Sequence, residues 1–343
     1  MDFTKIKFQY SINNIISLSL STGLDSFFVK IAILEYDFFN KFRNDGMSIK
    51  EIQKSFKIHE RSLNVLLPLF TSLSFLVYKK GKYFLTDYIK DYLLKNSEKY
   101  MGDFITFRTN YQLDSKIYKI VYSVIKTGKP INCTQNSGDW VNSLSIKKMC
   151  ESFTKAMDQR GKYLASKVSK KLKLSKCNNL VDIGGSSGIY SCFIAEKFKK
   201  LNVNILEIPS VAKNTRLILK KRKFEKRITV IEGDMFSFDY NNKYDVHFYS
   251  NVFHDWGKSD VKFLIKKSYQ GLPKNGKIIL HDGHLNFNKN EKSLIQNDIS
   301  LLIYTKGRYY YFQEIINLLK QIGFRKVKIK KIACGRSLII GQK

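Results

Sequence analysis

The sequence is short of acidic residues, of arginine and of paired cysteines, and each shortage narrows what the protein can be. It has 29 Asp and Glu against 60 Lys and Arg, a formal net charge of +31. The cysteines are odd in number and widely spaced, with no C-x-x-C pair: Cys133, Cys150, Cys177, Cys192 and Cys334. We therefore expect free thiols in a reducing, cytoplasmic compartment rather than a disulfide framework. No run of 18 apolar residues occurs, so we expect no membrane insertion.

The rest of the composition is that of an ordinary folded protein. Hydrophobic residues make up 43% and charged residues 26% of 343 residues. This excludes a disordered chain and a collagen-like fibre. The length suits one large domain or two of ordinary size, and such a chain buries enough surface to need no disulfides.

The excess of positive charge has two explanations. A nucleic-acid or anionic membrane partner is one of them. The other is codon bias in an A/T-rich genome, because only ten of the sixty cationic residues are Arg, the residue suited to bidentate phosphate recognition. The lysines are spread along the whole chain instead of gathering in a tail, which favours codon bias and no specific nucleic acid.

The first hundred residues read as mainly helical, with one hairpin. Ser48 and Glu51 have the spacing of a capping box, which predicts a helix ending near Ile58. Leucines at helical spacing predict a second helix over 60–75, and two short strands follow within 76–85 around a Lys-Gly turn. This order is typical of a winged helix. Such a domain binds DNA or packs between subunits, and we favour packing, partly because Phe27, Phe28 and Ile31 are apolar.

Further helices are expected over 100–172, with a break at Gly128-Lys129-Pro130, and beyond them strands and helices alternate. The strand candidates are 180–183, 203–206, 228–231, 244–249, 277–280, 325–332 and 337–340. Alternation of this kind predicts an α/β fold with a mostly parallel sheet and helices on both faces. The link between the last two strands is so short that they must be antiparallel neighbours. We therefore predict seven strands, one of them antiparallel to the others.

A glycine-rich turn follows the first of these strands. It begins at Asp182, contains Gly184 and Gly185, and opens a helix, so the backbone can approach a ligand closely. Nineteen residues beyond Gly188, Glu207 ends the second strand, where a carboxylate can accept from both hydroxyls of a ribose. The G-x-G-x-x-G pattern of NAD sites is not met, which favours S-adenosylmethionine (SAM). A purely structural glycine turn is the alternative.

Two later strand ends supply further candidates. Asp234 could accept from the adenine amino group, with Met235 and Phe236 covering its faces. His254 follows the fourth strand and can act as a general base, and Asp282 at the end of the fifth could fix its tautomer.

Metal binding is not expected. His281-x-x-His284 has no acidic or cysteine partner at ligand spacing, so we interpret these histidines and His247 as structural or surface residues.

Taken together these motifs resemble the SAM-dependent O-methyltransferases of the caffeic-acid and acetylserotonin type, including bacterial polyketide enzymes. The segments that carry the resemblance occur in the family's order over nearly the whole chain: 180–188, 206–211, 233–236, 253–256, and 307–310 before Gly323-Phe324. The resemblance implies the class I methyltransferase fold, with a Rossmann-like sheet. Residues 1–105 would form a winged-helix dimerisation domain of a homodimer, and 106–343 the catalytic domain, with a helical acceptor-pocket segment over 106–172.

The resemblance also implies roles for individual residues. His254 would be the base, Asp255 would lie beside a small-molecule acceptor, and Asp282 would stand where the family has a histidine-orienting Glu. Phe153 and Met157 match a pair that lines the acceptor pocket.

Several positions depart from the family pattern. Ser186 replaces a glycine, and Glu207 replaces the usual Asp. Ser250 stands where the plant enzymes have a lysine near the cofactor, and we expect it among the cofactor-binding residues. The second histidine-supporting Glu is missing, and Tyr309 stands about where it would fall.

The function that we predict is SAM-dependent methyl transfer to a hydroxyl of an aromatic or polyketide-like molecule, in secondary metabolism. Methylation of N or C, a nucleic-acid methyltransferase, and a SAM-binding protein without catalysis remain as alternatives.

Overall fold

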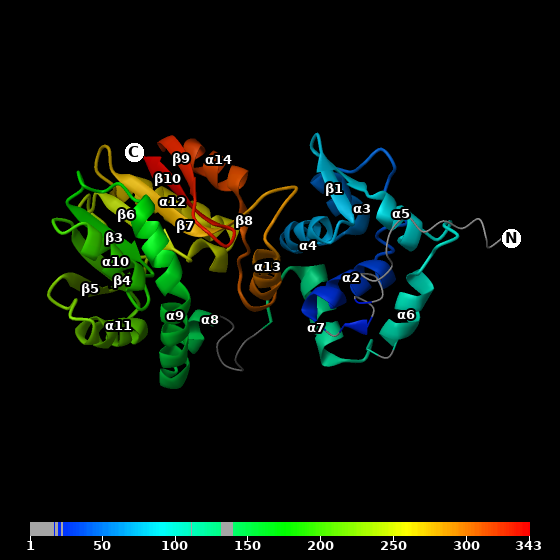
Figure 1. Ribbon diagram of the computed structural model, residues 1–343, viewed down its shortest axis with the longest axis horizontal. Helices are drawn as coiled ribbons and strands as arrows, with labels where there is room; N and C mark the ends of the chain where they lie inside the picture. The colour runs from blue at the N-terminus through cyan, green and yellow to red at the C-terminus, as the bar shows by residue number, and fades with distance from the viewer. Residues whose placement is uncertain (1–16, 18–19, 22, 111, 132–139) are drawn as a thin grey trace. The chain divides into compact units, whose positions relative to one another are not determined.

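The protein divides into two compact units (Figure 1). The computed structural model describes residues 17, 20–21, 23–110, 112–131 and 140–343, so Cys133 lies outside the described residues. Unit 1 comprises Met1–Ile131 and Asn286–Tyr304, and unit 2 comprises Asn132–Leu285 and Thr305–Lys343. The domain boundary expected after residue 105 falls within helix α6 of unit 1. The role of residues 1–105 in dimerisation stays a prediction.

Unit 1 is built from helices and one hairpin. Its elements are α2 (Leu24–Leu34), α3 (Ile49–Phe56), α4 (Glu60–Ser72), β1 (Leu76–Lys79), β2 (Lys82–Leu85), α5 (Asp87–Leu93), α6 (Gly102–Asn110), α7 (Lys116–Thr127) and α13 (Lys292–Tyr304). The capping box at the start of α3 is confirmed, since Ser48 Oγ accepts from the Glu51 amide and Glu51 accepts from the Ser48 amide. The predicted order of helix, turn, helix and hairpin is confirmed as well.

The core of unit 1 is rich in phenylalanine. Phe38 is fully buried and stacks on Phe56 with ring centroids 4.4 Å apart, and Phe70 lies 5.3 Å from it. Phe27 and Phe28 are buried inside the unit in the same way, and so is Ile31. Their apolar character, from which packing between subunits was predicted, is accounted for by burial within the unit. Their burial in α2 stabilises the unit itself.

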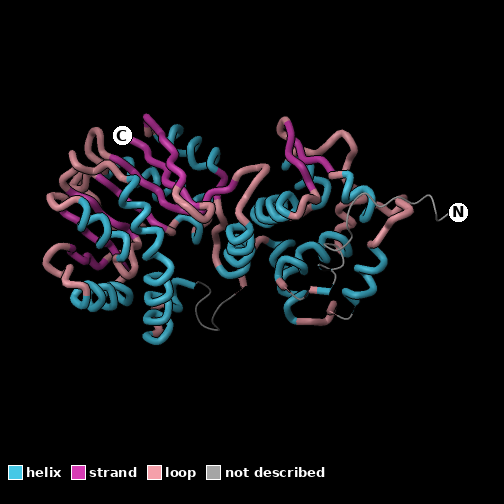
Figure 2. Tube along the Cα trace, in the orientation of Figure 1, coloured by secondary structure: helices cyan, strands magenta, loops and turns pink. Residues whose placement is uncertain are grey.

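Unit 2 is an α/β unit around one large sheet (Figure 2). Its elements are α8 (Trp140–Ser143), α9 (Lys147–Lys171), β3 (Asn179–Ile183), α10 (Ile189–Lys197), β4 (Asn202–Glu207), α11 (Pro209–Lys221), β5 (Ile228–Glu232), β6 (Val246–Ser250), the 3-10 turn η2 (Phe253–Asp255), α12 (Lys258–Gly271), β7 (Lys277–Leu285), β8 (Tyr310–Tyr311), α14 (Phe312–Ile322), β9 (Arg325–Lys331) and β10 (Arg336–Gln342). The main strand order is β5-β4-β3-β6-β7-β10-β9. In this order β10 alone runs opposite to the direction of the other strands, as predicted.

Helices cover both faces of this sheet, as the alternating pattern predicts. Leu180 of β3 packs in a core with residues of α9 and α10, whereas its neighbour Val181 packs in a second core with residues of α12 and α14. Successive residues of a strand point to opposite faces, so a strand that is apolar throughout serves both cores. The central strands β3, β6 and β7 are therefore mostly buried, whereas the edge strand β9 is largely exposed.

Two features of the sheet differ from the sequence-based expectation. β7 continues to Leu285, because β10 pairs with it from Lys277 to Gly283, so Asp282 lies within the strand and not at its end. The two-residue strand β8 was not predicted; it pairs with the last residues of β7, at His284 and Leu285. Both features depend on strand pairing between distant parts of the chain, which local patterns do not report.

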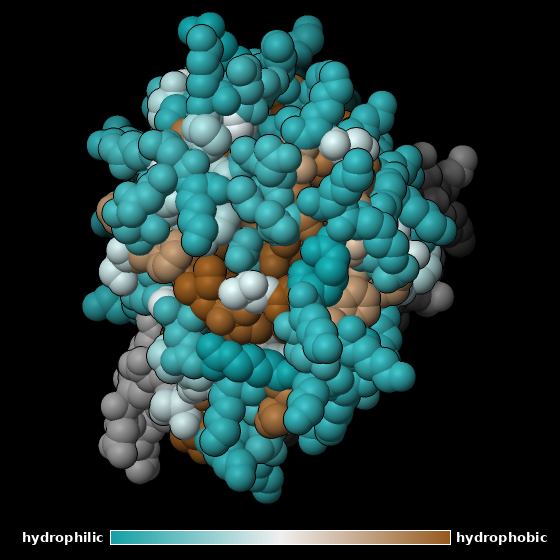
Figure 3. Space-filling model, turned by 90° about the vertical axis from the view of Figure 1, so that its left-hand side faces the viewer, coloured by the Kyte–Doolittle hydropathy of each residue, from teal (hydrophilic) through white to brown (hydrophobic). Residues whose placement is uncertain are grey.

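Hydrophilic surface side chains and unpaired cysteines were expected from the composition, and both occur in the structure. On the face seen in Figure 3 hydrophilic side chains predominate, and hydrophobic ones gather near its centre. Four cysteines are free thiols, Cys150, Cys177, Cys192 and Cys334. Among the described residues, no helix is both long and apolar enough to span a membrane.

Candidate active site

A cavity of about 510 Å³ opens in unit 2 at the carboxyl ends of β3, β4 and β6. This is the edge where strand order reverses around β3 and where open α/β sheets bind ligands. All eight residues predicted to bind the cofactor line it: Asp182, Gly184, Gly185, Glu207, Asp234, Met235, Phe236 and Ser250. The predicted acceptor residues Phe153, Met157 and Asp255 line it too, whereas His254, Asp282 and Tyr309 do not.

The glycine turn brings the backbone against the cavity. Gly184 has φ +72, a conformation that side chains rarely adopt, and a Cβ on Gly185 would lie 2.9 Å from the carboxyl group of Asp182. Asp182 is buried, and burial raises its pKa to about 7 although the Ser191 hydroxyl donates to it. Its Oδ1 has no hydrogen-bond partner among the described residues. A buried acceptor atom without a partner among the described residues thus lies at the cavity wall.

Glu207 ends β4 and is held by the backbone on both sides of its carboxylate. Oε1 accepts from the Ser186 amide at 2.9 Å and Oε2 from the Ile208 amide at 3.0 Å. Burial nevertheless raises the pKa of this carboxyl group to about 7. A carboxylate oxygen can accept more than one hydrogen bond, so both oxygens can still accept from a diol in the cavity.

The turn after β5 forms an aromatic side of the cavity. Asp234 accepts from the Phe236 amide at 3.0 Å, which fixes the turn. The ring of Phe236 meets Trp256 edge to face, with centroids 4.6 Å apart, and Met235 lies beside them on the cavity wall. A flat heteroaromatic ring fits against such side chains.

One face of α9 closes the cavity opposite the sheet. Phe153, Met157, Arg160 and Gly161 recur at helical spacing and all line it. A Cβ on Gly161 would lie 2.5 Å from a methyl group of Ile189, so this glycine lets α9 approach α10 closely. Arg160 is a cavity residue that the sequence analysis missed, although its spacing from Met157 could have revealed it.

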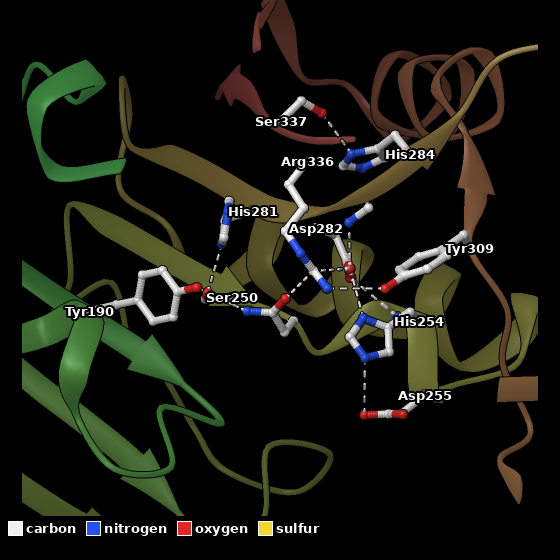
Figure 4. Close-up of polar contacts among 12 residues, drawn as sticks. Tyr190, Ser250, His254, Asp255, His281, Asp282, His284, Tyr309, Arg336 and Ser337 are labelled. Carbon is white, nitrogen blue, oxygen red and sulfur yellow. Dashed lines mark hydrogen bonds and ion pairs between the residues drawn. The ribbon is translucent and has the colours of Figure 1, made fainter. Parts of the chain in front are cut away.

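His254 and Asp282 form a buried pair beside the cavity (Figure 4). His254 Nδ1 lies 2.6 Å from Asp282 Oδ1, and Nε2 points toward Asp255, 3.7 Å from Oδ2. Burial alone would lower the pKa of His254, but the two carboxylates outweigh burial and raise it. Because Nδ1 donates to a carboxylate, the neutral ring keeps its lone pair on Nε2, on the side of the cavity residue Asp255.

Arg336 stands behind this pair and was not singled out from the sequence. Its Nη1 lies 3.8 Å from Asp282 Oδ1, and its Nη2 donates to the Tyr309 hydroxyl at 3.1 Å. Burial alone would raise the pKa of Asp282, but His254 and Arg336 outweigh it and hold that pKa below its usual range. Tyr309 is fully buried and packs edge to face on His254, with centroids 5.3 Å apart. The phenol therefore contacts both the imidazole of His254 and the guanidinium of Arg336.

The other histidines near the sheet edge are structural, as expected. His281 bonds to Ser250 through Nδ1 at 2.9 Å and His284 to Ser337 at 2.8 Å. Burial lowers the pKa of His281 to about 3 and that of His284 to about 4, so both rings are neutral near pH 7. No cluster of three metal-ligating side chains occurs among the residues that the structure describes.

Gly307 lets the segment that carries Tyr309 pass close to the backbone of His254. A Cβ on Gly307 would lie 2.1 Å from the backbone oxygen of His254 and 2.5 Å from the amide of Trp256. Both obstacles are backbone atoms, which do not move aside as a side chain does. Only glycine allows Tyr309 to reach the imidazole of His254.

Known proteins share both the sequence pattern and the fold. The O-methyltransferase domain family matches residues 135–325. The S-adenosyl-L-methionine-dependent methyl transferase PigF of a Serratia species is 28% identical over 166 residues, 48% of this chain and 48% of that protein. The match therefore spans about half the length of this relative.

Solved structures agree over nearly the whole chain. An O-methyltransferase family 2 protein from Planctomyces limnophilus, in complex with apigenin, has a TM-score of 0.80 at 19% identity and covers 98% of both chains. Human N-acetylserotonin methyltransferase, in complex with SAM, has a TM-score of 0.62 at 17% identity and covers 98% of this chain and 99% of its own. At these identities the likeness shows the fold, which is that of the class I methyltransferases.

Proposed function

Because the chain belongs to the O-methyltransferase domain family, we propose that it transfers the methyl group of SAM to a hydroxyl of an aromatic or polyketide-like molecule. The observation that carries this proposal is the adjacency of two sites. One cavity joins a nucleoside-binding wall, with Glu207 and Asp234, to Asp255, directly in front of the buried His254–Asp282 pair.

The cavity residues fit SAM. Glu207 would accept from the ribose hydroxyls, and the turn of Asp234, Met235 and Phe236 would hold the adenine. The orphaned Oδ1 of Asp182 suits a ligand that donates hydrogen bonds, directly or through water. The absence of the G-x-G-x-x-G pattern also suits a cofactor without a pyrophosphate.

In this proposal the chain supplies a general base and the cavity in which the acceptor is bound. When bound, SAM provides a methyl group that is already electrophilic. His254 accepts the hydroxyl proton of the acceptor at Nε2, while Asp282 holds the ring through Nδ1 and stabilises the imidazolium that forms. Phe153 and Met157 orient the acceptor ring and exclude water. Orientation of this kind contributes on the order of 7 to 11 kcal/mol in favourable reactions.

Binding of S-adenosylhomocysteine (SAH) tests the cofactor, and product analysis tests the reaction. We expect calorimetry to show binding of SAH and none of NAD, and mass spectrometry to show a gain of one methyl group when SAM is supplied with a panel of hydroxylated aromatics. A preference for NAD would reject the cofactor. Methylation of RNA or DNA instead of the panel would favour the nucleic-acid alternative.

We also propose a homodimer formed through unit 1 in the cytoplasm, with a role in secondary metabolism. The free thiols support a reducing compartment. Phe104 and Phe107 of α6 are 38% and 55% exposed, and Ile117 of α7 is 47% exposed, which supports an interface on these helices. Light scattering that gives a 40.0 kDa particle at micromolar concentrations would contradict the dimer.

A further inference from the structure

Arg336 is a buried cation that connects the base to the cavity wall. It begins β10 beside Asp282, and its side chain is only 10% exposed. Its guanidinium contacts three groups from three different parts of unit 2: the carboxylate of Asp282, the hydroxyl of Tyr309 and the amide oxygen of Asn251 (Figure 4). Burial of a guanidinium is costly, so such a position calls for a role in structure or in chemistry.

We propose that Arg336 is a positioning residue for the base, which holds Asp282 in place and limits how tightly His254 retains a proton. This inference rests on the proposed role of His254 as base. The sequence lacks the second glutamate that would support the histidine. In this proposal a cation, Arg336, supports the His254–Asp282 pair instead.

The need for a cation follows from the charges around His254. The groups that face the imidazole are Asp282 and His284 of β7, Asp255 of η2, Tyr309 before β8, and Arg336 of β10. Two carboxylates next to a buried imidazole favour its protonated form, which cannot accept a proton. Arg336 opposes that effect from behind Asp282, and it also keeps Asp282 ionised.

The contacts of the guanidinium on the side away from Asp282 explain why this cation is an arginine, although most cationic residues of the chain are lysines. Asn251 accepts from Arg336, and its own amide donates to Ser250 Oγ at 3.1 Å and to the Tyr190 hydroxyl at 3.4 Å. Ser250, Asn251 and Tyr190 line the cavity. A planar fork can contact Asp282, Tyr309 and Asn251 together, whereas a lysine ammonium is a point charge on a flexible stem. Arg336 thereby fixes the base relative to the cavity wall.

A purely structural arginine is the competing explanation, and histidine titration separates the two. The chain has five histidines, so the ring signals of His254 can be followed by NMR in protein without cofactor and assigned with H254Q. We expect R336Q to raise the pKa of His254 by about one unit, the size of effect that one nearby charge produces. R336K keeps the charge and should titrate close to wild type. R325Q, which removes an exposed arginine of the neighbouring strand β9, is the charge-matched control and should change nothing.

The pH dependence of kcat then connects the titration to turnover. In R336Q the acid limb of kcat should move upward with the pKa, so activity below that limb falls about tenfold and recovers at higher pH. R336K should keep the position of the limb but lower kcat, because the fork no longer holds Asp282 and Asn251. An unchanged pKa of His254 in folded R336Q would overturn the proposal, and so would a shift in R336K as large as in R336Q. If R336Q does not fold, R336K is compared with the wild type, and a change of about one unit in the pKa of His254 in R336K would overturn the proposal, because the charge is kept. A shifted pKa with an unmoved limb of kcat would instead reject His254 as the base.

Discussion

The two units bury very different side chains. The core of unit 1 is mostly hydrocarbon and aromatic, although Lys30 and Asp298 are buried in it as well. Lys30 Nζ donates to neutral oxygens of Ser21 and Gln112 and lies over the ring of Phe27. Unit 2 buries Asp282, His254 and Arg336 against one another within its sheet edge. Buried charge costs free energy unless it is paired, and perturbed titratable groups cluster where chemistry occurs.

From this contrast we expect unit 1 to contribute mainly to stability and the polar groups of unit 2 mainly to cofactor binding and activity. Substitutions in unit 1 should lower the free energy of unfolding and leave the cofactor affinity of the folded protein unchanged. Substitutions among the polar groups of unit 2 should lower activity or affinity more than stability.

Replacement of His254, the proposed base, should have the largest effect. In His254→Gln we expect kcat to fall by roughly 10²- to 10⁴-fold, the contribution of a positioned general base, with SAH affinity nearly unchanged. Steady-state kinetics and calorimetry measure the two quantities. His59→Gln is the matched control, since His59 caps α4 in unit 1 and should not affect kcat. Full activity of His254→Gln near pH 7 would leave proximity as the only source of catalysis.

Truncation in the aromatic core of unit 1 should come next. Phe38→Ala removes a ring that stacks on Phe56 and packs on Phe70, and we expect a loss of about 3 to 5 kcal/mol in the free energy of unfolding. Leu217→Ala on the exposed side of α11 serves as control, with less than about 0.5 kcal/mol. Urea unfolding measures both. If the folded molecules of Phe38→Ala bound SAH more weakly than the wild type, unit 1 would affect cofactor binding as well as stability.

The acid at the end of β4 should make cofactor binding depend on pH. Burial raises the pKa of Glu207 to about 7 in the protein without ligand, and hydroxyls that donate to the carboxylate favour its ionised form. Binding then releases a proton, so SAH affinity should weaken as pH falls below about 7, by at most about tenfold per unit.

Variants at two neighbouring strand ends test this sign. Glu207→Gln should bind SAH more weakly at pH 8 and show a smaller dependence on pH. Glu232→Gln at the paired position of β5 should behave as wild type, because Glu232 is exposed and outside the cavity. Calorimetry from pH 5.5 to 8 measures these affinities. An affinity that rises toward low pH would contradict the assignment.

Loss of a helix cap should have the smallest effect. Ser48→Ala removes the side-chain acceptor of the capping box of α3 and should lower the free energy of unfolding by about 1 kcal/mol. Ser48→Asp, which restores a capping oxygen, should recover most of it. A fall in kcat of folded Ser48→Ala protein would show that the units are coupled.

Local patterns were sufficient for much of this molecule. The spacing of Ser48 and Glu51 predicted a cap, and apolar runs between turns predicted the seven strands of the main sheet. The residues of the cavity could be named because parallel strands end at one edge of the sheet, so Asp182, Glu207 and Asp234 had to lie together. These inferences need only neighbours in the chain and one rule of topology.

Other features depended on contacts between distant segments. The sequence alone does not distinguish whether Phe27 and Phe28 lie on the surface or in a core. The packing of unit 1 buries both of them. β8 forms because the end of β7 offers it a partner.

The surroundings of His254, the proposed base, show most clearly that local sequence patterns do not reveal contacts between distant segments. The sequence by itself indicated that His254 and Asp282 belong to adjacent strands of the sheet, and the structure places His254 Nδ1 2.6 Å from Asp282 Oδ1. Only the tertiary structure decided that Arg336, 54 residues after Asp282, stands behind that pair and that Tyr309 packs on the imidazole. The physical reason is that β10 returns antiparallel beside β7, and the energy of a charge depends on what surrounds it in space.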